Sequence, residues 1–321
     1  MRKSQLPEHL QGVSFALRAS DKSGVSRGRT RAKDLMVVSR GIRLPTQTQP
    51  RGAAAVRAYT ELDESSILSH VSAARLWEMP LPASLSGDWR LHIARRAVHS
   101  VPRRANTVGH LLTLAAGEDT EVDGVRLTSA PRTWLDMAST QTTMEDLVVM
   151  GDHLVCSHGP EFPAPREAVC SIDDLRQVVD AHPGARGIRK AREALNLVRV
   201  GADSAPESRM RLALVQAGLP EPALNLVVFD DFGRPIVWPD AAYLEHRVAL
   251  QYDGGHHGDE VQYLRDIRRA EASAAHGWLE VRVSQHDLTG ERPGVVLKVR
   301  RALESRAELA LRAGVSLKHA R

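Results

Sequence analysis

Cysteines are scarce in this sequence, and long apolar runs are absent. The 321 residues include only Cys156 and Cys170, which form no Cys-x-x-Cys pair. This count excludes a disulfide framework and an all-cysteine zinc site, and it favours a reducing compartment. No run approaches the roughly 18 apolar residues that would span a bilayer, and no apolar signal core follows the polar N-terminus. The sequence therefore predicts a cytoplasmic protein that does not contact a membrane.

The charge balance is only slightly basic, and we find no internal repeat or low-complexity segment. Lysine and arginine together number 43 against 39 acidic residues, which gives a net charge of +4 and a pI near 9.3. Arginine supplies most of the excess, as in residues 27–31 and 186–192. Such a surface is compatible with phosphate contacts, but a merely solvated arginine-rich surface has the same composition. Charge alone leaves both interpretations open.

The patterns divide the chain into three consecutive stretches. Residues 1–60 are basic and poor in large apolar side chains, so we expect helix fragments there at best. Residues 61–200 are expected to be mostly helical, and residues 201–206 form a linker. The elements expected in 61–200 are helices at 72–79, from Pro131 onward, at 144–155 and as a pair within 172–200, with one strand at 90–93.

From residue 201 to 321 the pattern predicts a mixed sheet flanked by helices. The element order is α-β-β-β-α-β-α, which places the protein in the α+β class. Ser204-Ala205-Pro206-Glu207 matches a capping box at the start of the first helix. The expected elements are a helix at 204–217, strands at 224–229, 236–243 and 248–253, a helix at 261–276, a strand at 278–283 and a helix at 295–313.

Two of these strands form a hairpin that gathers acidic and amide side chains on one face. A turn centred at residues 245–246 puts Asp240 opposite Gln251 and Trp238 opposite Asp253, while the other face is apolar. Opposed residues have Cβ atoms about 4.5–5.5 Å apart, so two acids at this spacing repel unless a cation lies between them. Mg²⁺ takes such oxygen ligands and promotes phosphodiester hydrolysis. The alternative is a solvated polar face of an edge hairpin.

Glycines and histidines follow this hairpin at residues 254–257. The glycines permit a sharp turn and close approach of a substrate backbone. Beside metal-binding acids, His257 is a candidate general base, and His256 a candidate phosphate contact. Further along, arginines on one helical face are candidate phosphate ligands, unless they pair with acids of the same helix. These arginines are Arg265, Arg268 and Arg269.

Spaced motifs within residues 204–290 resemble a nuclease family. They are Trp238-Pro239-Asp240, the run VALQYDGGHH at 248–257, Arg265-Asp266, Arg269, Gly277-Trp278 and Val281-Arg282-Val283. The pattern is similar to the very-short-patch-repair-like endonuclease domains of the PD-(D/E)XK superfamily, which have a restriction-endonuclease-like fold. By this resemblance Asp240 is the metal-binding aspartate, and Gln251 stands where most members have glutamate. Asp253 stands at the position of the superfamily's lysine, and His257 at that of the family histidine. Glu207 matches an acidic residue on the leading helix.

The resemblance implies a DNA endonuclease that uses one or two Mg²⁺ or Mn²⁺ ions. Asp240, Gln251 and Asp253 would hold the metal, and His257 would assist proton transfer. Gln251 removes a negative charge, which should loosen metal binding, and the lysine is absent. Helix capping is the favoured explanation for Glu207. A degenerate nuclease fold that binds without cutting therefore stays open as an alternative.

The N-terminal half carries a second resemblance. Its motifs are Gly24-Val25-Ser26-Arg27, the run RGIRLP at 40–45, the run SHVSAARLW at 69–77 and the run LTSAPRTWLD at 127–136. They look like the AbiEi family, antitoxins of type IV toxin–antitoxin systems that act as DNA-binding repressors. The resemblance implies a winged helix near residues 1–45, where basic residues are present but apolar periodicity is weak, so we expect a degenerate form. We interpret His70, which precedes a helix, as structural.

These observations define two function classes. The first is a metal-dependent endonuclease acting in phage defence or DNA repair. The second is a non-catalytic, antitoxin-like DNA-binding regulator with a cognate toxin or defence partner. A pure protein-interaction module is a third interpretation, because a fold does not determine a function.

Overall fold

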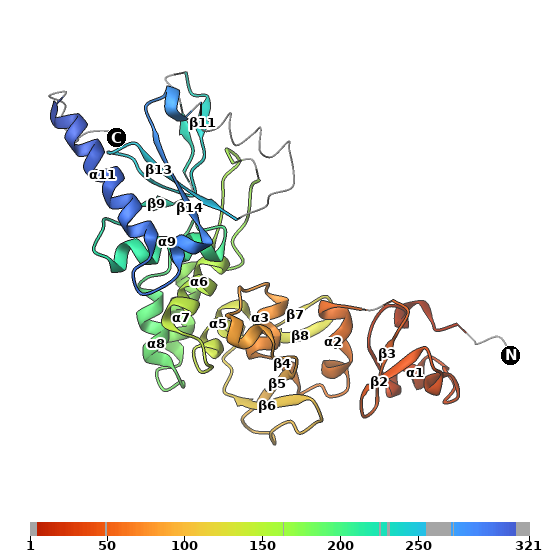
Figure 1. Ribbon diagram of the computed structural model, residues 1–321. Helices are drawn as coiled ribbons and strands as arrows, with labels where there is room; N and C mark the ends of the chain where they lie inside the picture. The colour runs from red at the N-terminus through yellow and green to blue at the C-terminus, as the bar shows by residue number, and fades with distance from the viewer. Residues whose placement is uncertain are drawn as a thin grey trace. The chain divides into compact units, whose positions relative to one another are not determined.

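The computed structural model describes residues 5–48, 50–162, 164–224, 226–229, 232–254, 271 and 273–312. It is an α+β protein with both mixed and antiparallel sheets (Figure 1), as the sequence predicted. The chain forms two compact units, each made of separated segments. The first unit comprises Met1–Leu147 and Ile172–Leu195, and the second comprises Val148–Ser171 and Asn196–Arg321. Three consecutive stretches were expected instead, so the grouping of 148–171 with the C-terminal residues differs from the prediction.

The first unit begins with a small three-stranded antiparallel sheet of order β1-β3-β2. The prediction of helix fragments at best is wrong here, because these strands are too short to show periodicity and the apolar cluster beside them is small among the described residues. Gly41 turns the β2–β3 hairpin with φ +80°, a conformation that glycine adopts without strain. The elements are η1 (Glu8–Leu10), β1 (Phe15–Ala16), α1 (Leu17–Lys22), η2 (Arg29–Arg31), β2 (Leu35–Ser39) and β3 (Ile42–Pro45).

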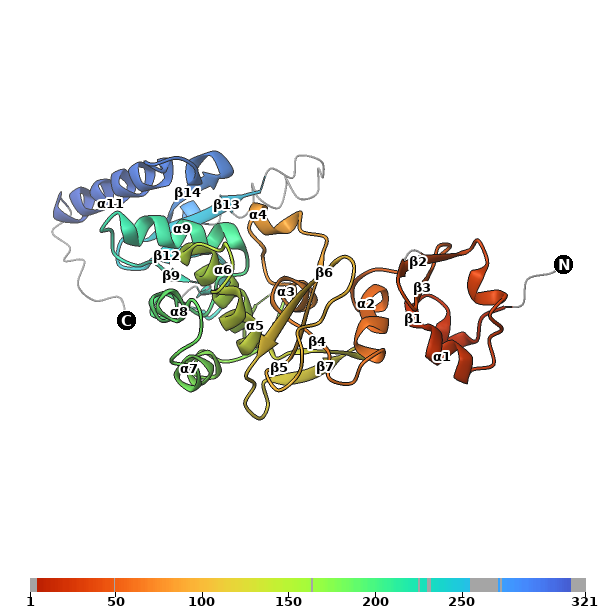
Figure 2. The same ribbon diagram turned by 90° about the horizontal axis from the view of Figure 1, so that it is seen from below.

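The rest of the first unit is built on a five-stranded mixed sheet of order β6-β5-β4-β8-β7. It can be followed in Figure 2, and β5 lies between β6 and β4 in the sheet. Pairs β5–β6 and β4–β8 are parallel, and the other neighbours are antiparallel. The strands are β4 (Ile67–Leu68), β5 (Leu91–Arg96), β6 (Thr107–Leu112), β7 (Asp119–Val122) and β8 (Val125–Thr128).

The helices of this unit largely follow the predicted pattern. A helix starting beside Pro131 and a pair within 172–200 are confirmed, whereas the expectation of a mostly helical region missed every strand except β5. Those strands are short or alternate poorly, so their pairing depends on partners that are distant in sequence. The helices are α2 (Gly52–Glu61), α3 (His70–Leu76), α4 (Ala83–Ser86), α5 (Ala130–Met137), α7 (Ile172–Ala181) and α8 (Ile188–Leu195). Helix α6 (Met144–Val155) is also confirmed. Its residues up to Leu147 belong to the first unit, and those from Val148 belong to the second.

The second unit has a four-stranded mixed sheet of order β14-β13-β12-β9. Helices α9 and α11 pack against one face of it (Figure 1), and their apolar side chains meet Tyr243, Val248 and Leu250 there. Strand β13 is antiparallel to β12 and parallel to β14. The elements are α9 (Ala205–Gln216), β9 (Ala223–Leu224), β12 (Ala241–Tyr243), β13 (Val248–Asp253), β14 (Leu279–Ser284), η3 (Gln285–Leu288) and α11 (Gly294–Arg312).

The predicted hairpin register is confirmed, but its first strand is shorter than expected. Ala241 pairs with Leu250 and Tyr243 with Val248, the register that sets Asp240 across from Gln251. The strand expected at 236–243 is broken around Pro239, which has no N–H to donate to a ladder. Its first part is β11 (Pro235–Val237), which pairs instead with β10 (Val228–Phe229), so Trp238 does not continue the hairpin opposite Asp253. The strand expected at 224–229 is likewise divided into β9 and β10.

Among the described residues, no helix combines the length and the apolar character needed to cross a membrane.

Candidate functional site

Asp240 stands just before β12, and strand β13 holds both of its carboxylate oxygens. The amide Nε2 of Gln251 donates a hydrogen bond of 2.8 Å to Oδ1, and the backbone N–H of Tyr252 donates one of 2.6 Å to Oδ2. Both Asp240 and Gln251 are half-buried. The proximity that the hairpin register predicted for these two side chains is therefore confirmed, and the carboxylate has a defined orientation.

Glu207 lies in the first turn of α9 and is buried. Its carboxylate accepts hydrogen bonds from the Ser204 hydroxyl at 2.7 Å and from the Asp203 backbone N–H at 2.9 Å. In return, Ser204 Oγ accepts from the Glu207 backbone N–H at 3.4 Å. The N-cap predicted at Ser204 is thus confirmed, because its hydroxyl accepts from a first-turn N–H. The Glu207 carboxylate accepts from the N–H of Asp203, which lies before the cap, and not from that of Ser204 as a capping box requires.

Glu207 is also coupled electrostatically to Asp240. Burial, followed by the negative charge of Asp240, raises the pKa of Glu207 to about 7. Two carboxylates in a partly desolvated site disfavour each other's ionised form. A proton or a cation relieves this repulsion, and carboxyl groups with such shifted pKa values are concentrated at functional sites. Helix capping and a place in the candidate site are therefore compatible roles for Glu207.

Asp253 ends β13 on the exposed side of the site. It follows Gln251 by two residues, so both side chains project from the same face of the strand. Strand β14 runs parallel beside it, with Ser284 as the backbone partner of Asp253. The remaining predicted site residues lie outside the described part of the chain: His256, His257, Arg265, Arg268 and Arg269.

A second polar cluster in the same unit was not predicted. Asp203 Oδ1 lies 2.6 Å from His158 Nε2 and 3.5 Å from Cys156 Sγ. Burial and the charge of Asp203 raise the pKa of Cys156 to about 12, so the sulfur is a protonated thiol and a poor nucleophile. The nearness of Cys156 and His158 in the sequence was the only available signal, because Asp203 follows 45 residues after His158.

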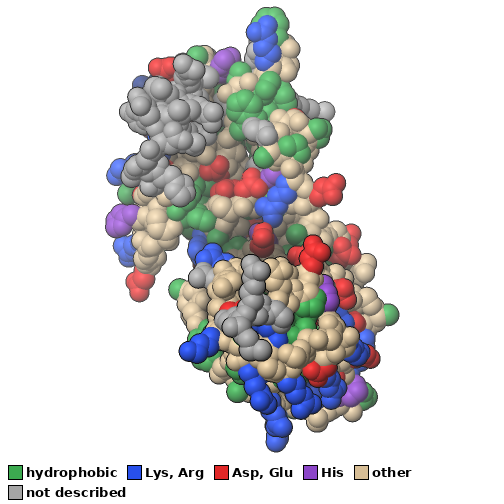
Figure 3. Space-filling model, turned by 90° about the vertical axis from the view of Figure 1, so that its right-hand side faces the viewer, with side chains coloured by type: hydrophobic (Ala, Val, Ile, Leu, Met, Phe, Trp, Pro, Cys, Tyr) green, Lys and Arg blue, Asp and Glu red, His purple; other side chains and the backbone are tan. Residues whose placement is uncertain are grey.

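In the first unit, the basic residues of the N-terminal sheet divide into structural and exposed groups. Arg29 forms a bidentate ion pair with Asp34, with nitrogen–oxygen distances of 2.9 and 3.1 Å. Arg43 donates a hydrogen bond to the Thr30 carbonyl. Arg27, Arg31 and Lys33 have exposed side chains. Lysine and arginine side chains gather along the lower edge of the first unit in Figure 3. Only the exposed group is available to contact a partner.

The chain is similar to two mycobacterial proteins. No family model matches the chain, and no solved structure matches it. The chain is 31% identical over 149 residues to two proteins of Mycobacterium tuberculosis, the uncharacterized protein Rv2248 of strain ATCC 25618 / H37Rv and the uncharacterized protein MT2308 of strain CDC 1551 / Oshkosh. The match covers 46% of this chain and 54% of each relative, so the chain spans about half the length of these relatives. The function is therefore inferred from the residues of this chain.

Proposed function

We propose that the second unit is a metal-dependent endonuclease-like domain that hydrolyses phosphodiester bonds in DNA. The observation that carries this proposal is the convergence of Asp240, Gln251 and Glu207, in which the charge of Asp240 helps to raise the pKa of Glu207 to about 7. The order of the leading helix α9, the β12–β13 hairpin and the parallel strand β14 supports the restriction-endonuclease-like arrangement that the motifs imply.

The oxygen donors at this site fit a hard divalent cation such as Mg²⁺ or Mn²⁺. Asp240 and Glu207 supply carboxylates whose mutual repulsion a cation would relieve. A half-turn of its amide lets Gln251 present oxygen instead of nitrogen, because the two ends have nearly the same shape. Asp253 would complete the set. When bound, one or two such ions would stabilise negative charge on the phosphodiester.

The chain's own residues would orient the site and carry protons. Tyr252 and Gln251 hold the Asp240 carboxylate by hydrogen bonds, and Glu207 can exchange a proton near neutral pH. We propose His257 as the general base, and His256 with the three arginines at 265, 268 and 269 as phosphate contacts. We also propose the cytoplasm as the location, from the cysteine content.

Cleavage assays on the wild type and on Gln251→Glu test the proposal. We expect plasmid DNA to be cut with Mg²⁺ or Mn²⁺ and to stay intact with a chelator. A carboxylate at position 251 should lower the metal concentration needed by roughly tenfold, because a further negative charge attracts the cation. Single-stranded DNA and RNA tested in parallel would define the substrate.

Gln177→Glu on α7 is a matched control, since it adds the same charge at an exposed position of the first unit. It should leave the metal requirement unchanged. Absence of cleavage by both the wild type and Gln251→Glu, in the presence of either metal, would contradict the nuclease proposal.

A second candidate function, an antitoxin-like DNA-binding regulator without catalysis, is favoured by two observations. The Gln251 amide already donates to Asp240, so this carboxylate is stabilised without a cation. The N-terminal elements follow the order expected of a winged helix: three short helices with β1 after the first, then a two-stranded wing. In this proposal η2 and the residues around it contact DNA, and a cognate toxin or defence partner binds elsewhere.

The double variant Arg31→Ala with Lys33→Ala tests this second function. Each lost phosphate contact should reduce the salt dependence of DNA binding by about one unit in the slope of log K against log salt, so we expect a change of about two. Arg300→Ala with Arg301→Ala removes the same charge from exposed positions of α11 and should change the slope less. Equal slopes in the two double variants would argue against DNA contact through the N-terminal sheet.

A further inference from the structure

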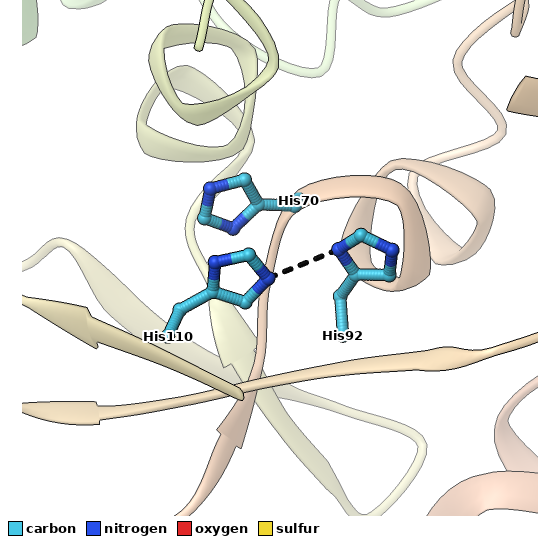
Figure 4. A group of neighbouring side chains, drawn as sticks. All are labelled: His70, His92 and His110. Atoms are coloured by element: carbon cyan, nitrogen blue, oxygen red, sulfur yellow. Dashed lines mark hydrogen bonds between the residues drawn. The ribbon is translucent and has the colours of Figure 1, made fainter. Parts of the chain in front are cut away.

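Three histidines from distant parts of the first unit meet at the edge of the five-stranded sheet. His92 comes from β5, His110 from the neighbouring parallel strand β6, and His70 from the start of α3 (Figure 4). One nitrogen of each ring lies within 4.8 Å of one nitrogen of each of the others. The β5–β6 register pairs Ala94 with His110, which puts His92 and His110 on the same face as diagonal neighbours.

The backbone conformation at His70 directs its side chain toward the other two histidines. His70 has φ +48°, a left-handed conformation that is costly for a side chain with a Cβ atom. The adjoining residues are tied to β5: Ser69 N–H donates to the His92 carbonyl at 3.0 Å, and the His92 N–H donates to Ser72 Oγ at 2.8 Å. The expectation that His70 is only a structural residue before a helix does not account for this arrangement.

The histidines pack against one another with few other polar partners. His70 and His110 stack with ring centroids 3.7 Å apart, and His92 Nδ1 lies 3.0 Å from His110 Nε2. His70 is buried and His110 is half-buried. Buried neutral imidazoles keep nitrogen lone pairs that a proton does not occupy, which is the form that binds metals.

The surroundings provide outer hydrogen-bond partners of the kind found around metal-binding histidines. Asp88 Oδ2 lies 3.5 Å from His92 Nε2, the nitrogen that faces away from His110. Ser69 Oγ lies 3.0 Å from His70 Nδ1. Carboxylate and hydroxyl partners of this type fix the orientation of a ligating ring and increase its basicity.

Cavities adjoin the cluster. One of about 510 Å³ is lined by His70 and His110, and a second of about 550 Å³ is lined by all three histidines. Asp136 also lines the first cavity, and its buried Oδ2 accepts no hydrogen bond from the described residues. An unsatisfied buried carboxylate oxygen requires a donor, so this cavity is suited to hold a polar ligand beside the imidazoles. Arg186 lines both cavities, whereas Arg90 forms an ion pair with Asp88 and Arg132 forms ion pairs with Asp136 and Glu118.

We propose that His70, His92 and His110 form a binding site for a divalent transition metal ion of the zinc class, with a coordination position open to the adjoining cavity. Three imidazole nitrogens suit Zn²⁺, which is usually four-coordinate and accepts nitrogen ligands, whereas Mg²⁺ prefers oxygen. Water or a small anion from the cavity, which Arg186 also lines, completes the coordination. This site is independent of the oxygen-rich site at Asp240, since it lies in the other unit and selects a different class of metal.

Metal binding to the chelator-treated full-length chain tests the proposal. All proteins would carry Cys156→Ser, because Cys156, His158 and Asp203 are a second group that could hold a metal. We expect Zn²⁺ to bind and to raise the Tm, and Co²⁺ to give the visible absorption bands of a nitrogen-ligated site. In the same background, His92→Gln and His110→Gln should each weaken Zn²⁺ binding on the order of 100-fold. His99→Gln, at an exposed position after β5, should have no effect.

The ligand-preserving variant His110→Cys separates metal binding from packing. It should retain Zn²⁺ binding and add the near-ultraviolet sulfur-to-Co²⁺ absorption that marks a thiolate ligand. Circular dichroism would establish that each variant is folded. The proposal is overturned if Zn²⁺ does not raise the Tm of the Cys156→Ser protein, or if its affinity and the Co²⁺ spectrum are the same in His92→Gln, His110→Gln and His99→Gln.

Discussion

Replacing Asp240 with alanine is expected to lower metal-dependent DNA cleavage on the order of 100- to 1000-fold. The carboxylate of Asp240 accepts a hydrogen bond from Gln251, and its charge helps to raise the pKa of Glu207. Under the proposed function, its removal takes away a metal ligand and the charge stabilisation that the metal would supply. This raises the barrier by about 3–4 kcal/mol, since each ~1.4 kcal/mol is tenfold in rate. Initial rates of plasmid nicking at saturating Mg²⁺ or Mn²⁺ measure the effect.

Glu245→Ala is the control for this variant. Glu245 is an exposed acid in the turn of the same hairpin, so its loss changes the net charge by the same amount at the other end of β12 and β13. Its rate should match that of the wild type. If Asp240→Ala cuts as fast as Glu245→Ala, the nuclease proposal fails. If neither the wild type nor the variant cuts and both bind DNA equally, the regulator is the better description.

Replacing Asp152 with alanine is expected to cost about 3–5 kcal/mol of the free energy of unfolding. Asp152 on α6 and Arg211 on α9 are both fully buried and lie 2.9 Å apart, and Asp152 also accepts from the Arg199 N–H at 2.7 Å. Without the carboxylate, Arg211 keeps a buried charge whose remaining anionic partner is the half-exposed Glu221, at 2.8 Å. Urea denaturation monitored by circular dichroism measures the loss.

The double variant Asp152→Leu with Arg211→Met removes both charges of the ion pair and keeps apolar side chains in their place. It therefore tests whether the loss in Asp152→Ala comes from the unpaired charge of Arg211 or from lost packing. Burial raises the pKa of Asp152 even though Arg211 lowers it, which indicates that desolvation outweighs the attraction. Removing both charges should therefore be less destabilising than removing one. A double variant no more stable than Asp152→Ala would contradict this account. Arg211 follows Glu207 by one helical turn, so the pair also holds the helix that presents Glu207.

The elements that could be predicted from sequence are those specified by neighbouring residues. The α9 cap is such a case, because Ser204 and Glu207 satisfy each other within one turn. The β12–β13 register is another, since a short turn and an alternating apolar face determine which residues lie opposite. This register correctly placed Asp240 beside Gln251. Pro239 marked the break before β12, but the prediction of one continuous strand did not use it.

Other contacts could not be predicted from residues that are close together in the sequence. Glu207 lies near Asp240 only because α9 packs on the sheet that β12 joins, and the charge coupling between them follows from that packing. The division of the chain into two interleaved units depends in the same way on contacts between distant segments, such as Asp152 with Arg211. No spacing rule connects residues that lie 33 or 59 positions apart in this way.

The sequence by itself determined the α+β class, the helix cap at Ser204 and the hairpin that carries Asp240 and Gln251, because each depends on side chains a few residues apart. Tertiary structure alone decided the raised pKa of Glu207, the small N-terminal sheet and the meeting of His70, His92 and His110. The physical reason is the range of the interactions. Capping and strand alternation act within a turn or a hairpin, whereas burial, charge coupling and ligand geometry arise only when distant segments pack together.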